Sequence, residues 1–124
     1  MTECEDNLKS IVSGNTMTVF PEGDIDHHNA RLVRSRIDTK MYIKRPEELI
    51  LDLSRVTFMD SSGLGLILGR FSKAQELGIA FKVINPTPQI KRILDLAGAE
   101  RLIRIESTPE SKNTTQPEVK KESI

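Results

Sequence analysis

The sequence predicts an α/β fold, in which helices pack against a mixed, mostly parallel β-sheet. Short apolar runs alternate with segments of helical spacing along most of the chain. Strands that are separated by helices pair in parallel through right-handed crossovers. The first two runs are separated only by Gly14 and Asn15, which indicates an antiparallel N-terminal β-hairpin. With 124 residues, the chain has the length of a single domain.

The hairpin is expected over residues 8–13 and 16–20. In the second run, Met17 and Val19 alternate with threonines, as in a strand that buries one face. The Pro-Glu-Gly sequence from Pro21 then ends the strand.

A first helix is expected over residues 27–40, with Asp26 as its N-cap. Apolar residues at helical spacing should form its buried face: Ala30, Val33, Ile37 and Met41. Polar residues at the intervening positions should face solvent: Arg31, Ser35 and Asp38.

The central stretch combines a buried strand with a second helix. Residues 49–53 are apolar except for Asp52, which suits a strand covered on both faces. A helix over residues 62–75 follows, with Gly78 as its C-terminal stop. Its apolar residues have helical spacing and should pack on the strand: Leu64, Ile67, Leu68 and Phe71.

The last part of the domain is expected to contain a strand over 80–84, a helix that begins at Pro88 and ends before Gly98, and an edge strand over 102–105. The third helix should bury four residues: Ile90, Ile93, Leu94 and Ala97. Residues 107–124 are rich in Ser, Thr, Pro, Lys and Glu, so we expect a disordered polar tail.

Two hydroxyls stand where the second helix begins. The first backbone N–H groups of a helix lack internal partners, and the helix dipole makes that end partly positive. Asp60 or Ser61 should cap the helix, which leaves the Ser62 hydroxyl exposed and unbonded. A phosphate on Ser62 would meet N–H donors and add one and a half to two negative charges, by a rough estimate. The alternative from position alone is that both serines only cap the helix.

The string from Ser54 to Arg70, Ser-Arg-Val-Thr-Phe-Met-Asp-Ser-Ser-Gly-Leu-Gly-Leu-Ile-Leu-Gly-Arg, resembles the signature of the anti-sigma factor antagonists. These are bacterial members of the STAS domain family. Near the N-terminus, Gly23-Asp24-Ile25-Asp26-His27-His28 stands where the family usually carries Gly-x-Leu-Asp, and its Asp-His-His form is most similar to the sporulation type. The resemblance covers residues 8–106. It therefore predicts a single STAS domain over 8–106, while polar composition predicts a flexible N-terminus over 1–7 and a disordered tail over 107–124.

The resemblance implies a binding module that is switched by phosphate. In its unphosphorylated form such a protein binds an anti-sigma factor that is also a serine kinase, and so releases the sigma factor. Phosphorylation, which the resemblance assigns to Ser62, inactivates it, and a serine phosphatase restores it. The implied partner-binding residues are Asp26, His27, Asp60, Ser61, Ser62 and Gly63. We expect Gly63 to keep the backbone accessible to the kinase.

Two alternatives remain open. One is a general-stress-type antagonist that acts by the same mechanism on a different sigma factor. The other is a STAS module that senses a nucleotide or an apolar molecule, which would require a ligand pocket.

Composition excludes several classes of partner. The 18 basic residues balance 18 acidic ones, so no net field favours nucleic acid through counterion release. The arginines at 31, 34 and 36 are interpreted as a solvated helix face. No apolar run approaches the roughly 20 residues that cross a membrane, and no signal peptide is visible. We therefore expect a cytoplasmic protein, monomeric when free, that contacts neither nucleic acid nor membrane.

No metal, cofactor or catalytic activity is expected. Adjacent positions on a helix do not face one point, so His27 and His28 make a poor chelate. Ser61 and Ser62 lack the Gly-x-Ser-x-Gly elbow, and a carboxylate alone activates serine poorly. On this interpretation the protein is a substrate of a kinase and a phosphatase and has no enzymatic activity of its own.

The glycines at 63, 65 and 69 match neither the dinucleotide fingerprint nor the P-loop. Gly65 and Gly69 lie about one helical turn apart, so one face of the second helix lacks side-chain bulk. We expect that face to admit the close approach of a strand or of a partner.

Overall fold

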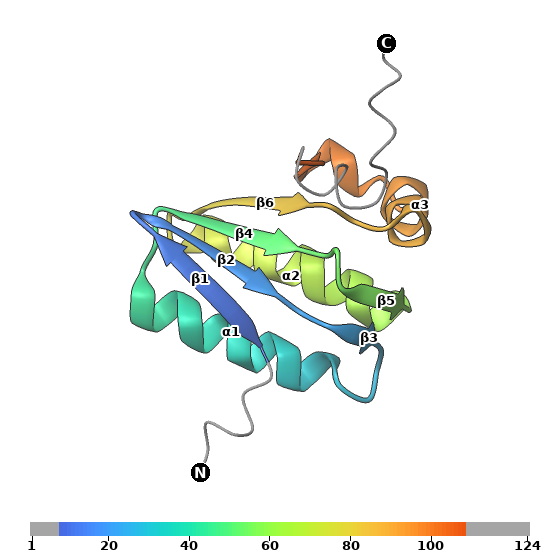
Figure 1. Cartoon of the computed structure of the whole chain (residues 1–124), viewed down its shortest axis with the longest axis horizontal. Coiled ribbons are helices and arrows are strands. Elements are labelled where there is room, and N and C mark those ends of the chain that lie inside the picture. The colour runs from blue at the N-terminus through green and yellow to red at the C-terminus, as the bar shows by residue number, and fades with distance from the viewer. Residues whose placement is uncertain (1–7, 109–124) are drawn as a thin grey trace.

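A computed structural model describes residues 8–108 of the chain (Figure 1). Predictions made for residues 1–7 and for residues 109–124 lie outside this range. The elements, in chain order, are β1 (Lys9–Ser13), β2 (Thr16–Phe20), β3 (Gly23–Ile25), α1 (Ala30–Lys44), β4 (Glu48–Asp52), β5 (Val56–Met59), α2 (Ser61–Glu76), β6 (Ala80–Ile84), α3 (Pro88–Leu96), the 3₁₀ helix η2 (Ala99–Arg101) and β7 (Arg104–Glu106).

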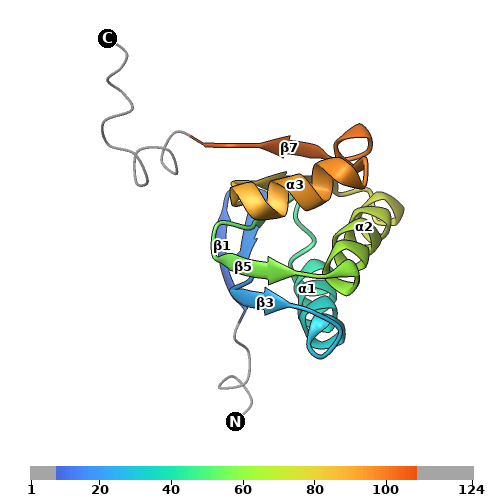
Figure 2. The same ribbon diagram turned by 90° about the vertical axis from the view of Figure 1, so that its right-hand side faces the viewer.

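The main sheet has five strands in the order β1-β2-β4-β6-β7. β1 and β2 form the expected antiparallel hairpin, and the other neighbours pair in parallel. Helices α1 and α2 lie side by side against one face of this sheet, and α3 lies beside β5 (Figure 2). The predicted α/β fold, with a mixed and mostly parallel sheet, is confirmed.

The core fills the space between the sheet and the two long helices. Met17, Leu49 and Leu51 are fully buried from the sheet side, and Ile37 and Ile67 meet them from α1 and α2. Burial of these apolar side chains is the main stabilising term, at about 25 cal/mol per Å² removed from water. The core fixes how α1 and α2 lie against each other, which matters for the surface between them.

The sequence prediction missed a second sheet. β3 and β5 pair in parallel as a separate two-stranded sheet, with Ile25 opposite Met59. Each strand is short, and β3 begins at Gly23, which lies next to the break expected after Pro21. Neither strand shows a periodic pattern of its own, because each depends on a partner more than 30 residues away.

Helix α1 begins and ends later than predicted. Asp26 does not cap the helix; its carboxylate accepts bonds from the backbone N–H groups of His28, at 2.9 Å, and Asn29, at 3.3 Å, and so forms a turn before it. The helix starts at Ala30 and continues to Lys44. It ends at Arg45, whose φ of 48° is left-handed.

Three smaller predictions also change. Asp38 does not face solvent freely, because it pairs with the buried Arg70. Ala97 is exposed, since α3 ends one residue before it. The last strand starts at Arg104 but does lie at the sheet edge, as expected. The described chain continues to Thr108, whose backbone N–H donates to Asn85 at 2.8 Å.

Candidate functional site

The β3–β5 sheet brings the two predicted site segments together. The turn at residues 26–29 follows β3, and residues 60–63 follow β5. Because the strands are parallel, both segments leave the same edge of the small sheet. The backbone N–H of Asp60 also donates to the carbonyl of Ile25 at 3.3 Å, which connects the two segments directly.

Asp60 is the N-cap of α2. Its Oδ1 accepts bonds from the backbone N–H groups of Ser62, at 2.8 Å, and Gly63, at 3.3 Å. Asp60 has the extended backbone that an N-cap requires, whereas Ser61 is already helical and exposed. Of the two residues that the sequence offered as caps, the structure therefore selects Asp60.

Ser62 is half-buried in the first turn of α2, and its hydroxyl lines a surface hollow. Within residues 8–108 this hydroxyl makes no hydrogen bond. The hydroxyl is unbonded in this range, as its position predicted, although the residue is half-buried and not fully exposed. One detail differs from that prediction: Asp60 already accepts from the N–H groups of Ser62 and Gly63, so a phosphate on Ser62 would compete with a carboxylate for them.

The histidines lie on the exposed side of the first segment. Nδ1 of His27 is 3.9 Å from Oδ2 of Asp60, and the rings of His27 and His28 are 4.0 Å apart. Asp26 lies behind them, where the backbone N–H of His28 holds the pKa of its carboxyl below the ordinary value. Asp26 therefore shapes the turn, and His27 provides its exposed surface.

Gly63 has a packing role that its sequence context did not reveal. It is buried, and a Cβ built on it would collide with the Met59 side chain and come within 2.7 Å of the Ile25 carbonyl oxygen. The expectation that Gly63 keeps the backbone exposed is therefore wrong. The residue lets α2 start directly against the β3–β5 sheet.

The hollow beside Ser62 contains three arginines that the sequence interpretation did not assign to the site. It has a volume of about 380 Å³ and lies between α1 and α2. Arg31 and Arg34 come from α1, and Arg70 comes from α2. Arg31 and Arg34 are three residues apart on α1, which places them on one face of the helix. The same spacing occurs on any solvated helix face, so it did not identify a site. We call this hollow the arginine groove.

Gly65 and Gly69 lie along the arginine groove, and a Cβ on either would meet no atom within 4 Å. No strand approaches them among the described residues. The packing of a strand on this face, one of the two options the sequence left, is therefore wrong. The missing side chains instead leave the groove open.

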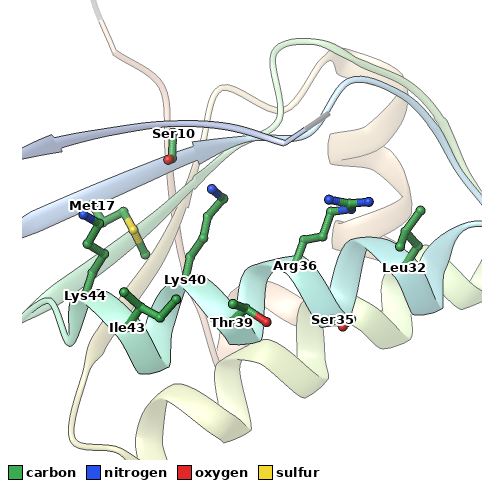
Figure 3. Close-up of a pocket in the computed structure, with 9 residues that line it drawn as sticks. All are labelled: Ser10, Met17, Leu32, Ser35, Arg36, Thr39, Lys40, Ile43 and Lys44. Atoms are coloured by element: carbon green, nitrogen blue, oxygen red, sulfur yellow. The ribbon is translucent and has the colours of Figure 1, made fainter. Parts of the chain in front are cut away.

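A second hollow, of about 420 Å³, lies between α1 and the hairpin (Figure 3). Its apolar part comes from Met17, Leu32 and Ile43, and its cationic part includes Lys44. It has the size of a small-molecule pocket, which a ligand-sensing module would need. However, none of the residues predicted for the site lines it.

No cluster of three or more His, Cys, Asp or Glu side chains that could hold a metal ion occurs within residues 8–108. None of the helices described has both the length and the apolar character of a membrane span.

Fold and site together define a small regulatory binding domain, with an accessible serine where a helix begins beside a β-strand. The family comparison agrees: the STAS domain model matches residues 7–112. The chain belongs to the STAS family, and within it to the anti-sigma factor antagonists, which are regulatory rather than catalytic proteins.

Named relatives support this assignment. The chain is 36% identical over 83 residues to the anti-sigma F factor antagonist of Paenibacillus polymyxa, covering 67% of this chain and 71% of that protein. It is 28% identical over 96 residues to the anti-sigma-B factor antagonist of Bacillus subtilis, covering 77% and 86%.

Solved structures of SpoIIAA have the same fold. The unphosphorylated form of this anti-sigma factor antagonist superposes with a TM-score of 0.68 at 24% identity, covering 89% of this chain and 96% of that one. The phosphorylated form of SpoIIAA, the Bacillus cell-fate determinant, superposes with a TM-score of 0.63 at 26% identity, covering 87% and 97%.

Proposed function

We propose that this protein is a phosphate-controlled antagonist of an anti-sigma factor that is also a serine kinase. The unmodified protein binds the kinase and releases its sigma factor. The kinase then transfers the γ-phosphoryl group of ATP to Ser62: an O–P bond forms at Oγ, the bond to ADP breaks, and the hydroxyl loses its proton. A serine phosphatase hydrolyses the ester and restores the active form.

The single observation that carries the proposal is the unbonded Ser62 hydroxyl in the first turn of α2. Asp60 satisfies the backbone at this point, so the hydroxyl has no structural task that modification would disturb. The solved phosphorylated form of SpoIIAA supports the same chemistry in a relative.

The proposed docking face is formed by the two segments that follow β3 and β5. Asp26 and His27 contribute from the first segment, and Asp60, Ser61 and Ser62 from the second. Gly63 supports this face from below by its close packing. A phosphate on Ser62 adds one and a half to two negative charges next to Asp60, by a rough estimate, and like charges that are forced together at an interface destabilise it.

Ser62 and Ser61 provide a matched test. The protein is incubated with its candidate kinase and ATP, and phosphate is located by mass spectrometry. Ser62→Ala should abolish labelling and keep docking, whereas Ser61→Ala should keep the labelling. Ser62→Asp should weaken docking by roughly tenfold or more, equivalent to about 1.4 kcal/mol. Undiminished labelling of Ser62→Ala would disprove the assignment of the site.

The relatives also bear on the choice of sigma factor. The 36% identity to an anti-sigma F factor antagonist and the Asp-His-His turn favour the sporulation type over the general-stress type. The test is to compare binding to purified anti-sigma F and anti-sigma-B factors. Tighter binding to the anti-sigma-B factor would favour the general-stress alternative, with the mechanism unchanged.

A further inference from the structure

The arginine groove holds more positive charge than the described structure neutralises. Within residues 8–108, neither Arg31 nor Arg34 forms a salt bridge, and both are exposed. Arg70 is 7% exposed and pairs with Asp38, yet its Nε is buried without a hydrogen-bond partner. The groove thus contains an unsatisfied buried donor below two unpaired guanidinium groups.

Helix packing places Arg31 nearly level with Ser62. Helices α1 and α2 both begin at the β3–β5 end and run side by side in the same direction (Figure 1). The contact between Asp38 and Arg70 fixes their relative register. Because both helices rise 1.5 Å per residue, Arg31 lies level with Gly63, about one residue from Ser62.

Arg34 lies one turn further along α1, about 6 Å beyond the level of Ser62. Long side chains on a helix tend to lean toward its N-terminus, which for Arg34 is the direction of Ser62. Ser62, Arg31 and Arg34 all line the same hollow. The two arginines therefore lie across the groove from Ser62, on the other helix.

The start of α2 provides a phosphate with fewer free hydrogen-bond donors than a helix N-terminus normally does. The N–H groups of Ser62 and Gly63 already donate to Asp60, and that carboxylate would repel a phosphate. The favourable partners for an anion on Ser62 lie across the groove. Arginine suits this role because its planar guanidinium can donate two parallel hydrogen bonds to phosphate oxygens.

We propose that the arginine groove binds the phosphoryl group of Ser62 within the same chain, with Arg31 and Arg34 as its direct ligands and Arg70 at the floor of the groove. The two unpaired cations match the charge of the phosphate dianion, so the modified groove becomes nearly neutral. Phosphorylation then removes two arginines from the surface in addition to adding a phosphate beside Asp60. This inference rests on the proposed modification of Ser62.

The test uses protein that carries phosphoserine at position 62, incorporated during translation, so that no kinase is needed. The second pKa of the phosphate, about 6 in an unperturbed phosphoserine, is measured by ³¹P NMR titration. Neighbouring cations favour the dianion and lower this pKa. We expect the wild-type value to lie at least about 0.5 units below that of the Arg31→Gln/Arg34→Gln double variant.

Lys44→Gln is the matched control. It removes a positive charge from the same helix, about 15 Å along the axis from Arg34, and should leave the phosphate pKa unchanged. Nδ1 of His27 lies 3.9 Å from Asp60 Oδ2, beside the start of α2, so the comparison is repeated in a His27→Asn background, where the effect of the arginines should persist. Thermal unfolding midpoints report whether the variants remain folded.

Equal phosphate pKa values in the wild type and the double variant, both folded, would overturn the inference. An equally large change of the phosphate pKa in Lys44→Gln would also overturn it, because the pKa would then depend on the overall charge of the protein and not on the arginines of the groove. Failure of the proposed function is detected separately. If the candidate kinase does not label Ser62, the proposed function fails, while the titration still decides whether the groove binds a phosphate at this position.

Discussion

Replacing Gly63 with alanine should destabilise the protein, although alanine is normally the better helix residue. A Cβ at position 63 would lie 2.7 Å from the Ile25 carbonyl oxygen, whereas ordinary contact begins at 3.4 Å, so the two must separate by about 0.7 Å. The carbonyl belongs to β3, which is held by its pairing with β5, and it accepts the Asp60 N–H. Movement at this point therefore strains both site segments.

The magnitude follows from two opposing terms. Overpacking a tight site costs about 1–3 kcal/mol. The change from glycine to alanine inside a helix recovers up to about 1 kcal/mol. We expect a net loss of about 1–2 kcal/mol in the free energy of unfolding.

Gly65→Ala is the matched control on the same helix. A Cβ there meets nothing within 4 Å, so only the helix-propensity term remains, and the variant should be more stable by about 0.5–1 kcal/mol. The two variants should thus differ by roughly 10 °C in thermal midpoint, as followed by circular dichroism. If Gly63→Ala melts at or above the wild-type temperature, the close-packing argument is refuted.

Three further predictions concern the polar contacts. Asp60→Ala should lower the free energy of unfolding by about 1 kcal/mol in urea titrations, because α2 loses its cap, while Asp60→Asn should retain most of it. Asp38→Ala should lower the free energy of unfolding by about 2–3 kcal/mol in the same assay, because it leaves Arg70 buried without its carboxylate. A loss of about 1 kcal/mol or less, which is typical of an exposed salt bridge, would contradict this. The folded-state pKa of Asp26 is lowered by the N–H of His28, so its contribution to stability is present above the unfolded-chain value of about 3.9 and is lost as pH falls through the folded value. Asp26→Asn should therefore lose less stability than the wild type between about pH 5 and pH 2, and an unchanged pH profile would argue against this role.

The parts of the fold that periodicity controls could be predicted from the sequence. The alternating residues of β2 and the apolar run of β4 gave both strands to within a residue or two, since their side chains must alternate or be wholly apolar to fit the core. The start of α2 was predicted to one residue because cap chemistry is local. β3 and β5 were missed because their pairing is non-local and each strand is only three or four residues long.

In the candidate site, too, local features could be predicted from the sequence and features that depend on helix packing could not. Asp60 and Ser62 are two residues apart, so helix-start chemistry predicted a cap at Asp60 or Ser61 and a free hydroxyl at Ser62, while the modification of Ser62 was implied by the family resemblance. The arginine groove could not be predicted, because it depends on how α1 lies against α2. Arg31 is 31 residues from Ser62 in the chain, and the alignment of the two helices depends on core packing and on the contact between Asp38 and Arg70.

The small β3–β5 sheet has a consequence for molecular recognition. Two surface segments that are more than 30 residues apart both emerge from it, and the hydrogen bond from Asp60 to Ile25 joins them at their base. Their separation is consequently a property of the scaffold and does not depend on loop conformation. A partner that contacts both segments therefore meets a surface that is already ordered, so little conformational entropy is lost on binding.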